Sequence, residues 1–137
     1  MKIYMSGSIY GGTQKIDTYK KLIEALKSYG EILDDQIADE NTIAKEAFQN
    51  DEDIYKDLES KMKIADIIFA EVSIPSLGVG YELGFADKLG KRIIAIYDET
   101  YTPKVSTMIR GNKRIGLIPY KDISEIINNL DNILKKY

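Results

Sequence analysis

The fold follows from SIPSLGVGYELGFADKLG, residues 73–90, which comes directly after the apolar run Ile67–Ala70. An unbroken apolar run without alternation predicts a strand that is buried on both faces, as in a parallel sheet. The chain then passes two glycines and takes up helical spacing over Leu77–Leu89, and Gly90 ends the predicted helix. Glu82 lies in the first turns of that helix. A strand, a glycine turn and a helix start together point backbone N–H groups toward a ligand.

Strand and helix patterns alternate along the rest of the chain. Further strands are expected at Lys2–Ser6, Glu31–Leu33, Arg92–Tyr97 and Ile115–Tyr120, with the buried strand running from Asp66 through Glu71 or Val72. Further helices are expected at Thr13–Ser28, Asn41–Phe48 and Asp51–Ile64, in one turn at Val105–Arg110, and in one final helix capped by Asp122 or Ser124. This alternation predicts one α/β domain over residues 1–137. Its doubly wound, five-stranded parallel sheet has the flavodoxin-like order 2-1-3-4-5 and helices on both faces.

The predicted strand order also predicts where a ligand binds. In that order, ligands bind outside the carboxyl ends of the first and third strands. The loops at this point are Gly7–Thr13 and Ser73–Gly80, and both contain glycines that let the backbone approach a phosphate or a sugar. The first loop alone matches neither a Walker loop nor a dinucleotide fingerprint, and it also suits an ordinary strand-to-helix turn. The agreement of the two loops therefore carries the prediction of a site.

The composition of the chain excludes several kinds of partner and several kinds of catalysis. With a net charge of −3, the chain of 137 residues has no electrostatic reason to bind a nucleic acid polymer or an anionic membrane. No apolar run reaches membrane-spanning length and the first residues resemble a strand rather than a signal peptide, so a cytoplasmic location is expected. The chain has no Cys and no His, which excludes disulfides, thiolate chemistry and the commonest general base and metal ligand. We expect catalysis by carboxylates, Tyr, Lys or hydroxyl groups, with no cofactor and no metal.

The charges are unevenly distributed. Between Glu31 and Lys61 there are eleven Asp or Glu and three Lys, most of which suit a solvated face. Asp57 lies beside the apolar stripe of its predicted helix, so its side chain faces either a cleft or bulk water. Between Lys104 and Lys121 there are five Lys or Arg and no acid, which suits either charge balance or the attraction of an anion.

Three segments together resemble the nucleoside 2-deoxyribosyltransferase superfamily. They are IYMSGSIYGG at residues 3–12, ADIIFAEVSIPSLGVGYELG at residues 65–84 and STMIRG at residues 106–111. The match follows nearly the whole chain in order, and it is closest to the branch of 2′-deoxynucleoside 5′-monophosphate N-hydrolases. The resemblance implies cleavage of the N-glycosidic bond of a deoxynucleotide, which yields a free base and 2-deoxyribose 5-phosphate.

The resemblance also implies roles for individual residues. Glu82 is the expected nucleophile, which attacks C1′ and forms a glycosyl-enzyme ester, and Tyr4 orients that carboxylate. Ser76 is expected to bind the 5′-phosphate, and Ser106 to reach the phosphate bound to the other subunit of a homodimer. The other substrate-binding residues implied by the resemblance are Gly7, Ser8, Ile9, Tyr10, Gly11, Gly12, Gly78 and Met108.

The second carboxylic acid of the family lies in a DLE-type segment before the third strand. Asp57-Leu58-Glu59 matches that segment, and Asp57 is the expected acid. Its distance to Asp66 is one residue longer than the usual pattern, which leaves Glu59 or Asp53 as alternatives. In retaining glycosidases such an acid stands about 5 Å from the nucleophile and serves first the leaving group and then the attacking water.

The glycine loop departs from the family in one position. Monophosphate hydrolases often have Arg in the form SIRGG, where this chain has Tyr10. Tyr10 can instead stack on a base or cover an unphosphorylated sugar, so a deoxyribosyltransferase that exchanges bases is an alternative function. A nucleotide sensor without catalysis is an alternative of another class. Contacts to the base are expected within Asp34–Asn50.

Overall fold

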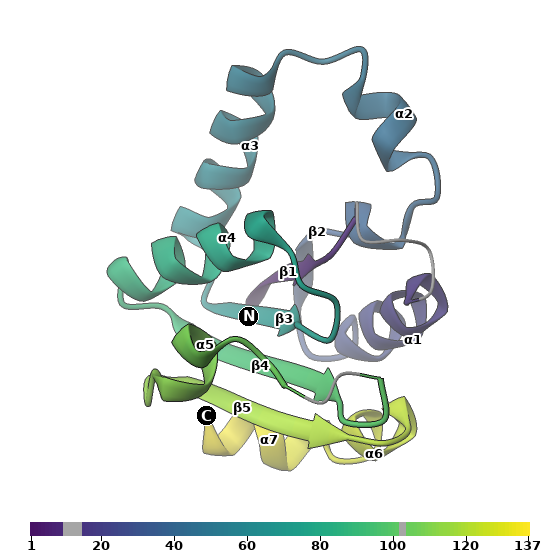
Figure 1. Ribbon diagram of the computed structural model, residues 1–137, viewed down its shortest axis with the longest axis vertical. Helices are drawn as coiled ribbons and strands as arrows, with labels where there is room; N and C mark the ends of the chain where they lie inside the picture. Colours follow the sequence, from purple (N-terminus) through teal and green to yellow (C-terminus); the bar gives the residue numbers. More distant parts are fainter. Residues whose placement is uncertain (10–14, 102–103) are drawn as a thin grey trace.

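Five parallel strands form the centre of the molecule in the order β2-β1-β3-β4-β5 (Figure 1). The computed structural model describes residues 1–9, 15–101 and 104–137. The strands are β1 (Lys2–Gly7), β2 (Glu31–Asp34), β3 (Ile67–Glu71), β4 (Arg92–Asp98) and β5 (Ile115–Tyr120). The predicted α/β class and strand order are confirmed, and the carboxyl ends of β1 and β3 lie next to each other as expected.

Helices cover both faces of this sheet. They are α1 (Ile16–Leu26), a short 3₁₀ helix η1 (Gln36–Ala38), α2 (Thr42–Glu46), α3 (Asp51–Ile64), α4 (Leu77–Lys88), α5 (Thr107–Gly111), α6 (Ile123–Ile127) and α7 (Leu130–Lys136). Helices α2 and α3 extend beyond the β2 edge of the sheet (Figure 1). In the described part of the chain, no helix combines the length and the hydrophobicity that crossing a membrane requires.

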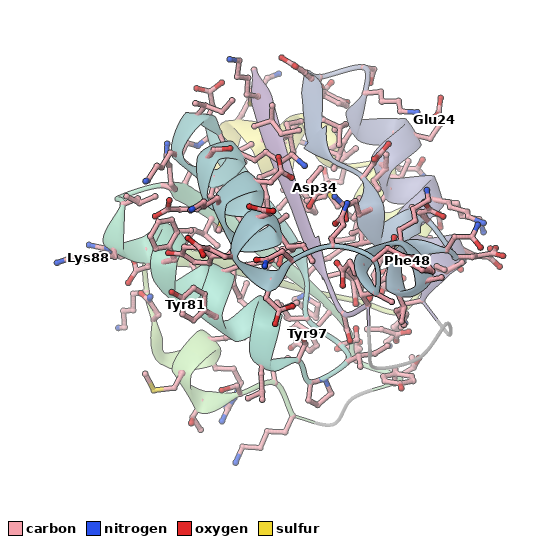
Figure 2. All side chains as sticks on the ribbon, turned by 90° about the horizontal axis from the view of Figure 1, so that it is seen from above. Glu24, Asp34, Phe48, Tyr81, Lys88 and Tyr97 are labelled. Carbon is pink, nitrogen blue, oxygen red and sulfur yellow. The ribbon has the colours of Figure 1, made fainter. Side chains whose placement is uncertain are left out.

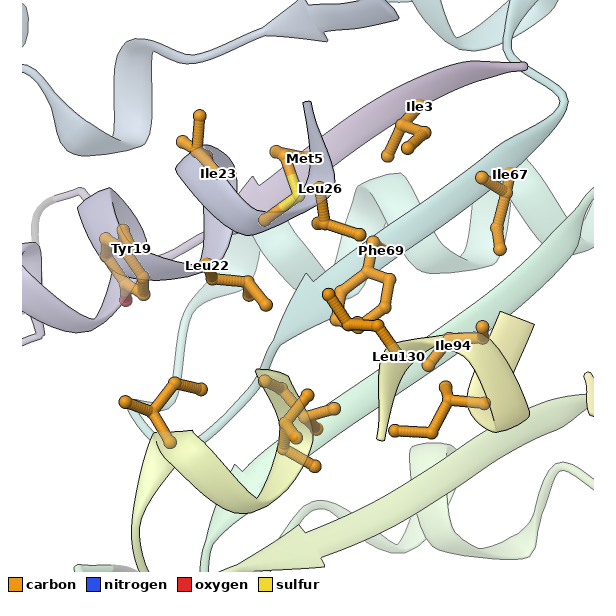
Figure 3. Close-up of a cluster of buried hydrophobic side chains, with 14 of the residues drawn as sticks. Ile3, Met5, Tyr19, Leu22, Ile23, Leu26, Ile67, Phe69, Ile94 and Leu130 are labelled. Carbon is orange, nitrogen blue, oxygen red and sulfur yellow. The ribbon is translucent and has the colours of Figure 1, made fainter. Parts of the chain in front are cut away.

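The central strand β3 is buried along its whole length, as its apolar run predicts. Ile67 and Phe69 pack into the cluster formed with α1, α6 and α7, and Figure 3 shows Phe69 between Leu26 and Leu130. Ile68 and Ala70 point to the opposite face and pack against α3 and α4. Because alternate residues serve two apolar layers, this strand fixes the position of the helices on both sides.

The helix that contains Glu82 has well-defined ends. At its N-terminus, the Ser76 hydroxyl accepts a hydrogen bond from the backbone N–H of Val79 at 3.3 Å. Past its C-terminus, Gly90 adopts a φ of +68°, in the left-handed region that glycine enters without steric cost. The glycine end and the Ser76 cap hold α4 in register with the end of β3.

The prediction of one final helix was wrong. The Asp122 carboxylate begins α6 by accepting the backbone N–H of Ser124 at 2.9 Å, so the predicted Asp122 cap is confirmed. The helix then ends in a tight turn in which the N–H of Asn129 donates to the carbonyl of Ile126 at 3.0 Å. Asn129 leaves the helical conformation before α7 begins. Two consecutive asparagines favour this break because their amides compete for backbone hydrogen bonds.

Candidate active site

Glu82 is held by two hydroxyl groups that β1 supplies. The Tyr4 hydroxyl donates to Oε1 at 3.0 Å, and the Ser6 hydroxyl donates to Oε2. Tyr4 and Ser6 are two residues apart on one strand, so both side chains point to the α4 face of the sheet. Each oxygen of the carboxylate therefore has a fixed hydrogen-bond donor, and the lone pairs that remain are held in one orientation.

The surroundings of Glu82 also set its charge. Burial raises the pKa of its carboxyl group to about 6, against the lowering effect of the hydrogen bonds from Ser6 and Tyr4. Burial, followed by the charge of Glu82, raises the pKa of Tyr4 far above its ordinary value. Near neutral pH the pair is thus mainly a carboxylate and a neutral phenol, with the phenol donating its proton in the hydrogen bond.

A cavity of about 270 Å³ opens beside Glu82, between α3 and α4. Its wall is mainly apolar and aromatic, and Tyr55 and Tyr81 meet there edge to face with ring centroids 6.5 Å apart. Tyr81 lies on the outer side of α4 (Figure 2). The cavity is lined by Glu46, Asp51, Ile54, Tyr55, Leu58, Met62, Gly78, Tyr81 and Glu82. Its size and its carboxylate suit a small ring-bearing ligand.

The expected second acid, Asp57, lies on α3 but outside this lining. Its side chain is 52% exposed and pairs with Lys61 at 2.5 Å. The next residue, Leu58, faces the cavity instead. Of the two alternatives, Glu59 pairs with Lys63 at 3.0 Å and Asp53 is exposed in the first turn of α3. The charge of Asp57 nevertheless contributes to the high pKa of Tyr4, so this carboxylate lies near the Tyr4–Glu82 pair.

Ser76, Ser106 and Met108 come together in another cavity, of about 670 Å³, between α4 and α5. This cavity has an apolar wall, and Lys104 brings a cation to it. The Ser106 hydroxyl accepts the backbone N–H of Met108 at 3.3 Å. Glu82 does not belong to its lining. Within one chain, the expected phosphate-binding serines and the expected nucleophile therefore line two different cavities.

The described part of the glycine loop is closely packed. A Cβ atom at Gly7 would lie 3.1 Å from the Tyr19 ring, so a side chain here would require the ring to shift by a few tenths of an ångström. Ser8 is buried and its carbonyl accepts the Tyr19 hydroxyl at 3.3 Å, and Ile9 packs against the core. The remaining expected loop residues, Tyr10, Gly11 and Gly12, lie outside the described residues.

Two residues near Glu82 were missed by the sequence analysis. Ser6 was assigned only to a strand, although its spacing of two from Tyr4 was a signal that both share a face. Asp34 was named only as the first residue of the segment Asp34–Asn50, where contacts to the base were expected, yet its side chain is 6% exposed and lies beside β1 (Figure 2). An acid directly after the apolar pair Ile32-Leu33, at the carboxyl end of a strand, was the available signal.

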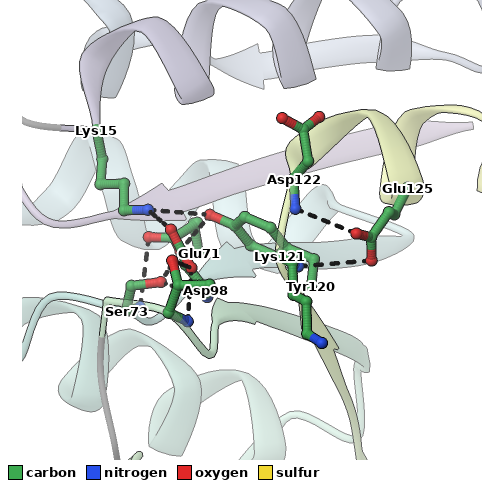
Figure 4. A network of polar contacts seen from close by, with 9 residues as sticks. Lys15, Glu71, Ser73, Asp98, Tyr120, Lys121, Asp122 and Glu125 are labelled. Carbon is green, nitrogen blue, oxygen red and sulfur yellow. Dashed lines mark hydrogen bonds and ion pairs between the residues drawn. The ribbon is translucent and has the colours of Figure 1, made fainter.

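A second buried polar cluster joins the carboxyl ends of β3, β4 and β5 (Figure 4). Lys15 pairs with Asp98 at 2.5 Å, and the Tyr120 hydroxyl donates to Glu71 at 3.0 Å. Ser73 also donates to Glu71, and its hydroxyl accepts the backbone N–H of Asp98 at 2.7 Å. The polar groups of the cluster pair with one another, with one cation for two carboxylates, and they connect the strand ends on the side of the sheet away from Glu82.

Comparisons with known proteins find relatives over the whole chain. A family model described as nucleoside 2-deoxyribosyltransferase matches residues 3–121. The chain is 36% identical to a 5-hydroxymethyl-dUMP N-hydrolase of Danio rerio, over 100% of this chain and 95% of that protein. It is 35% identical to a protein of Nematostella vectensis with the provisional name 2′-deoxynucleoside 5′-phosphate N-hydrolase 1, over 93% of this chain and 92% of that protein.

A solved structure shows the same fold. The CMP N-glycosidase BcmB of Clostridium botulinum superposes with a TM-score of 0.71 and covers 97% of this chain and 99% of its own. The two sequences are 23% identical, so this likeness concerns the arrangement of strands and helices.

Proposed function

Because the chain belongs to the nucleoside 2-deoxyribosyltransferase family, we propose that it hydrolyses 2′-deoxynucleoside 5′-monophosphates at the N-glycosidic bond. The products are a free base and 2-deoxyribose 5-phosphate. The observation that carries this proposal is the Glu82 carboxylate, held by the hydroxyls of Tyr4 and Ser6 of β1. The names of the relatives support the substrate class.

In the first step, a Glu82 oxygen attacks C1′ of the sugar. The C1′–N bond breaks and its electron pair passes to the base. Because the sugar develops positive charge as the base leaves, a carboxylate beneath C1′ stabilises that charge and then traps it as an ester. Tyr4 and Ser6 keep the carboxylate aimed at one point, which reduces the reorganisation that the reaction requires.

In the second step, water attacks C1′, the ester bond breaks and Glu82 returns as a carboxylate. The departing base needs a proton and the attacking water must lose one, so a second acid is required. We propose Asp57 for this exchange, with the exposed face of α3 giving it access to water. Glu59 and Asp53 on the same helix are the alternatives. As in retaining glycosidases, the same group would first donate and then accept the proton.

We further propose that the 5′-phosphate binds Ser76 of one chain and the partner subunit's Ser106 in a homodimer. Leu77 is 97% exposed and Met108 is 82% exposed, and both line the cavity between α4 and α5. Large apolar side chains exposed together on one face are typical of an interface. A homodimer through this face would bring Lys104 and the second serine toward the start of α4, where backbone N–H groups favour an anion.

Replacing Ser76 by alanine tests the phosphate site. The Ser76→Ala variant should raise the KM for monophosphates by about tenfold, because a hydrogen bond to a charged group is lost. The KM for unphosphorylated deoxynucleosides should change much less. Ser28→Ala, at an exposed serine after α1, is the matched control. Equal effects on both substrate classes would show that Ser76 acts as a helix cap and does not bind the phosphate.

Release of free base from each deoxynucleoside 5′-monophosphate, followed by chromatography, tests the proposed function itself. Base exchange on unphosphorylated deoxynucleosides would identify a transferase, which uses the same nucleophile with a different acceptor. Tight nucleotide binding without release of base would identify a sensor.

A further inference from the structure

Asp34 is a buried carboxylate that the proposed reaction does not yet use. It is the last residue of β2 and stands opposite Tyr4 of β1. The register shifts between Ile3, which pairs with Ile32, and Tyr4, which pairs with Asp34. The β2 strand therefore carries one extra residue at this point, as in a β-bulge.

The bulge decides which face Asp34 occupies. Ile32 packs toward the α1 side of the sheet and Leu33 toward the α3 side, so regular alternation would return Asp34 to the α1 side. Instead, Asp34 approaches Lys61 of α3, with its Oδ1 3.9 Å from Nζ. Tyr4 belongs to the same face, and its hydroxyl donates to Glu82. The irregular register thus brings a second carboxylate to the side of the sheet where the proposed nucleophile lies.

The charge of Asp34 is incompletely compensated. Lys61 lies closer to Asp57, at 2.5 Å, than to Asp34. The other contact described for the Asp34 carboxylate is the backbone N–H of Gln36 at 3.3 Å. Burial raises the pKa of Asp34 to about 6, against the lowering effects of Lys61 and this N–H group. A buried charge costs stability, and an apolar side chain would fill the position at lower cost, so the acid calls for a functional reason.

We propose that Asp34 is a positioning residue of the site, whose negative charge acts on the Tyr4–Glu82 pair and on the cationic sugar that forms beside it. This inference rests on the proposed function. A second negative charge near Glu82 deepens the negative potential where positive charge develops at C1′. The negative charge of Asp34 also opposes the ionisation of Glu82. It raises the pKa of Glu82 further, although burial is the larger cause. Asp34 thereby adds to the effect of burial on the pH at which the nucleophile becomes active.

Other ionisable groups face Asp34 and Glu82 from each neighbouring element. They are Tyr4 from β1, Lys61, Asp57 and Asp51 from α3, Glu46 from α2, Tyr81 from α4, Tyr55 from α3 and Asp35 directly after β2. Asp35 is exposed and differs from Asp34 by a single position. Its replacement makes the same change in charge where solvent screens it, which gives a matched control.

The test compares Asp34→Asn, Asp35→Asn and Ser6→Ala. Removing the charge of Asp34 should lower the pKa of Glu82, so the acid limb of the kcat/KM profile should move to lower pH by on the order of 0.5 unit. At pH 8 the kcat should fall about three- to tenfold, because the cationic sugar loses a nearby charge. Ser6→Ala removes a donor to Glu82, so the acid limb of its profile should move to higher pH. Asp35→Asn should move the acid limb much less than Asp34→Asn does, because solvent screens the charge of Asp35.

A titration of side-chain carboxyl carbons by ¹³C NMR makes the outcome independent of turnover. In the folded protein, the Glu82 midpoint should fall in Asp34→Asn and move much less in Asp35→Asn. An unchanged or raised Glu82 midpoint in folded Asp34→Asn would overturn the inference, as would a lowered midpoint without any fall in kcat. If the wild type releases no base from any nucleotide, the proposed function fails, and the NMR midpoints alone then decide whether Asp34 acts on Glu82.

Discussion

Replacing Glu82 by glutamine is expected to reduce the rate of base release by about 10³- to 10⁶-fold, because an amide cannot form the ester with C1′. Glutamine has the same shape as glutamate, and the Tyr4 and Ser6 hydroxyls can rotate to meet its amide. Substrate binding should therefore persist while turnover is lost. Single-turnover measurements with a radiolabelled monophosphate, together with denaturation of the quenched sample, would show a labelled wild-type protein and an unlabelled variant.

The stability of Glu82→Gln separates a lost nucleophile from a lost fold. Because burial raises the pKa of Glu82 to about 6, its ionisation opposes folding near neutral pH. This cost is absent at low pH, where the group is protonated in both states, and appears as the pH rises between the unfolded pKa and 6. The variant should thus melt at or above the wild-type temperature at pH 7. Glu24→Gln, at an exposed position of α1, is the matched control and should keep full activity. Turnover retained in Glu82→Gln would contradict the mechanism.

Replacing Lys15 by methionine is expected to destabilise the fold by about 3–5 kcal/mol. The Lys15 and Asp98 side chains are only 7% and 13% exposed and pair at 2.5 Å. Methionine fills similar space but leaves the carboxylates of Asp98 and Glu71 buried without their cation. Burial alone would raise the pKa of Asp98, yet hydrogen bonds from Lys15 and Thr100 hold it below its usual value, so the charged pair persists into the acid range.

Lys20→Met provides the matched control for this pair. Lys20 contacts Glu40 at 2.9 Å, but both side chains are largely exposed, so its loss should cost less than about 1 kcal/mol. Urea unfolding at pH 7 measures both variants. Equal, small effects would show that the cluster of Lys15, Glu71 and Asp98 is dispensable for stability.

The sequence was sufficient for the features that depend on periodicity. The apolar run of β3 specified a strand covered on both faces, and the alternation of elements specified the strand order. Gly90 marked the C-terminal end of α4. These signals are local, and each of them corresponds to one physical requirement, either burial or a backbone conformation.

The features that were missed depend on three-dimensional contacts. The side chain of Asp34 lies on the α3 face because of a bulge, and no residue type in β2 predicts that bulge. Ser6 acts as a hydrogen-bond donor to Glu82 only in the folded chain, where α4 places Glu82 beside it.

The most direct test of the central claim is a chromatographic assay for free base. The protein is incubated with each deoxynucleoside 5′-monophosphate, each ribonucleoside 5′-monophosphate, and each deoxynucleoside with a second base added. The proposed function predicts that free base and 2-deoxyribose 5-phosphate appear in equal amounts from deoxynucleoside monophosphates alone. Exchange of bases on unphosphorylated deoxynucleosides, or release of no base from any compound, would contradict it.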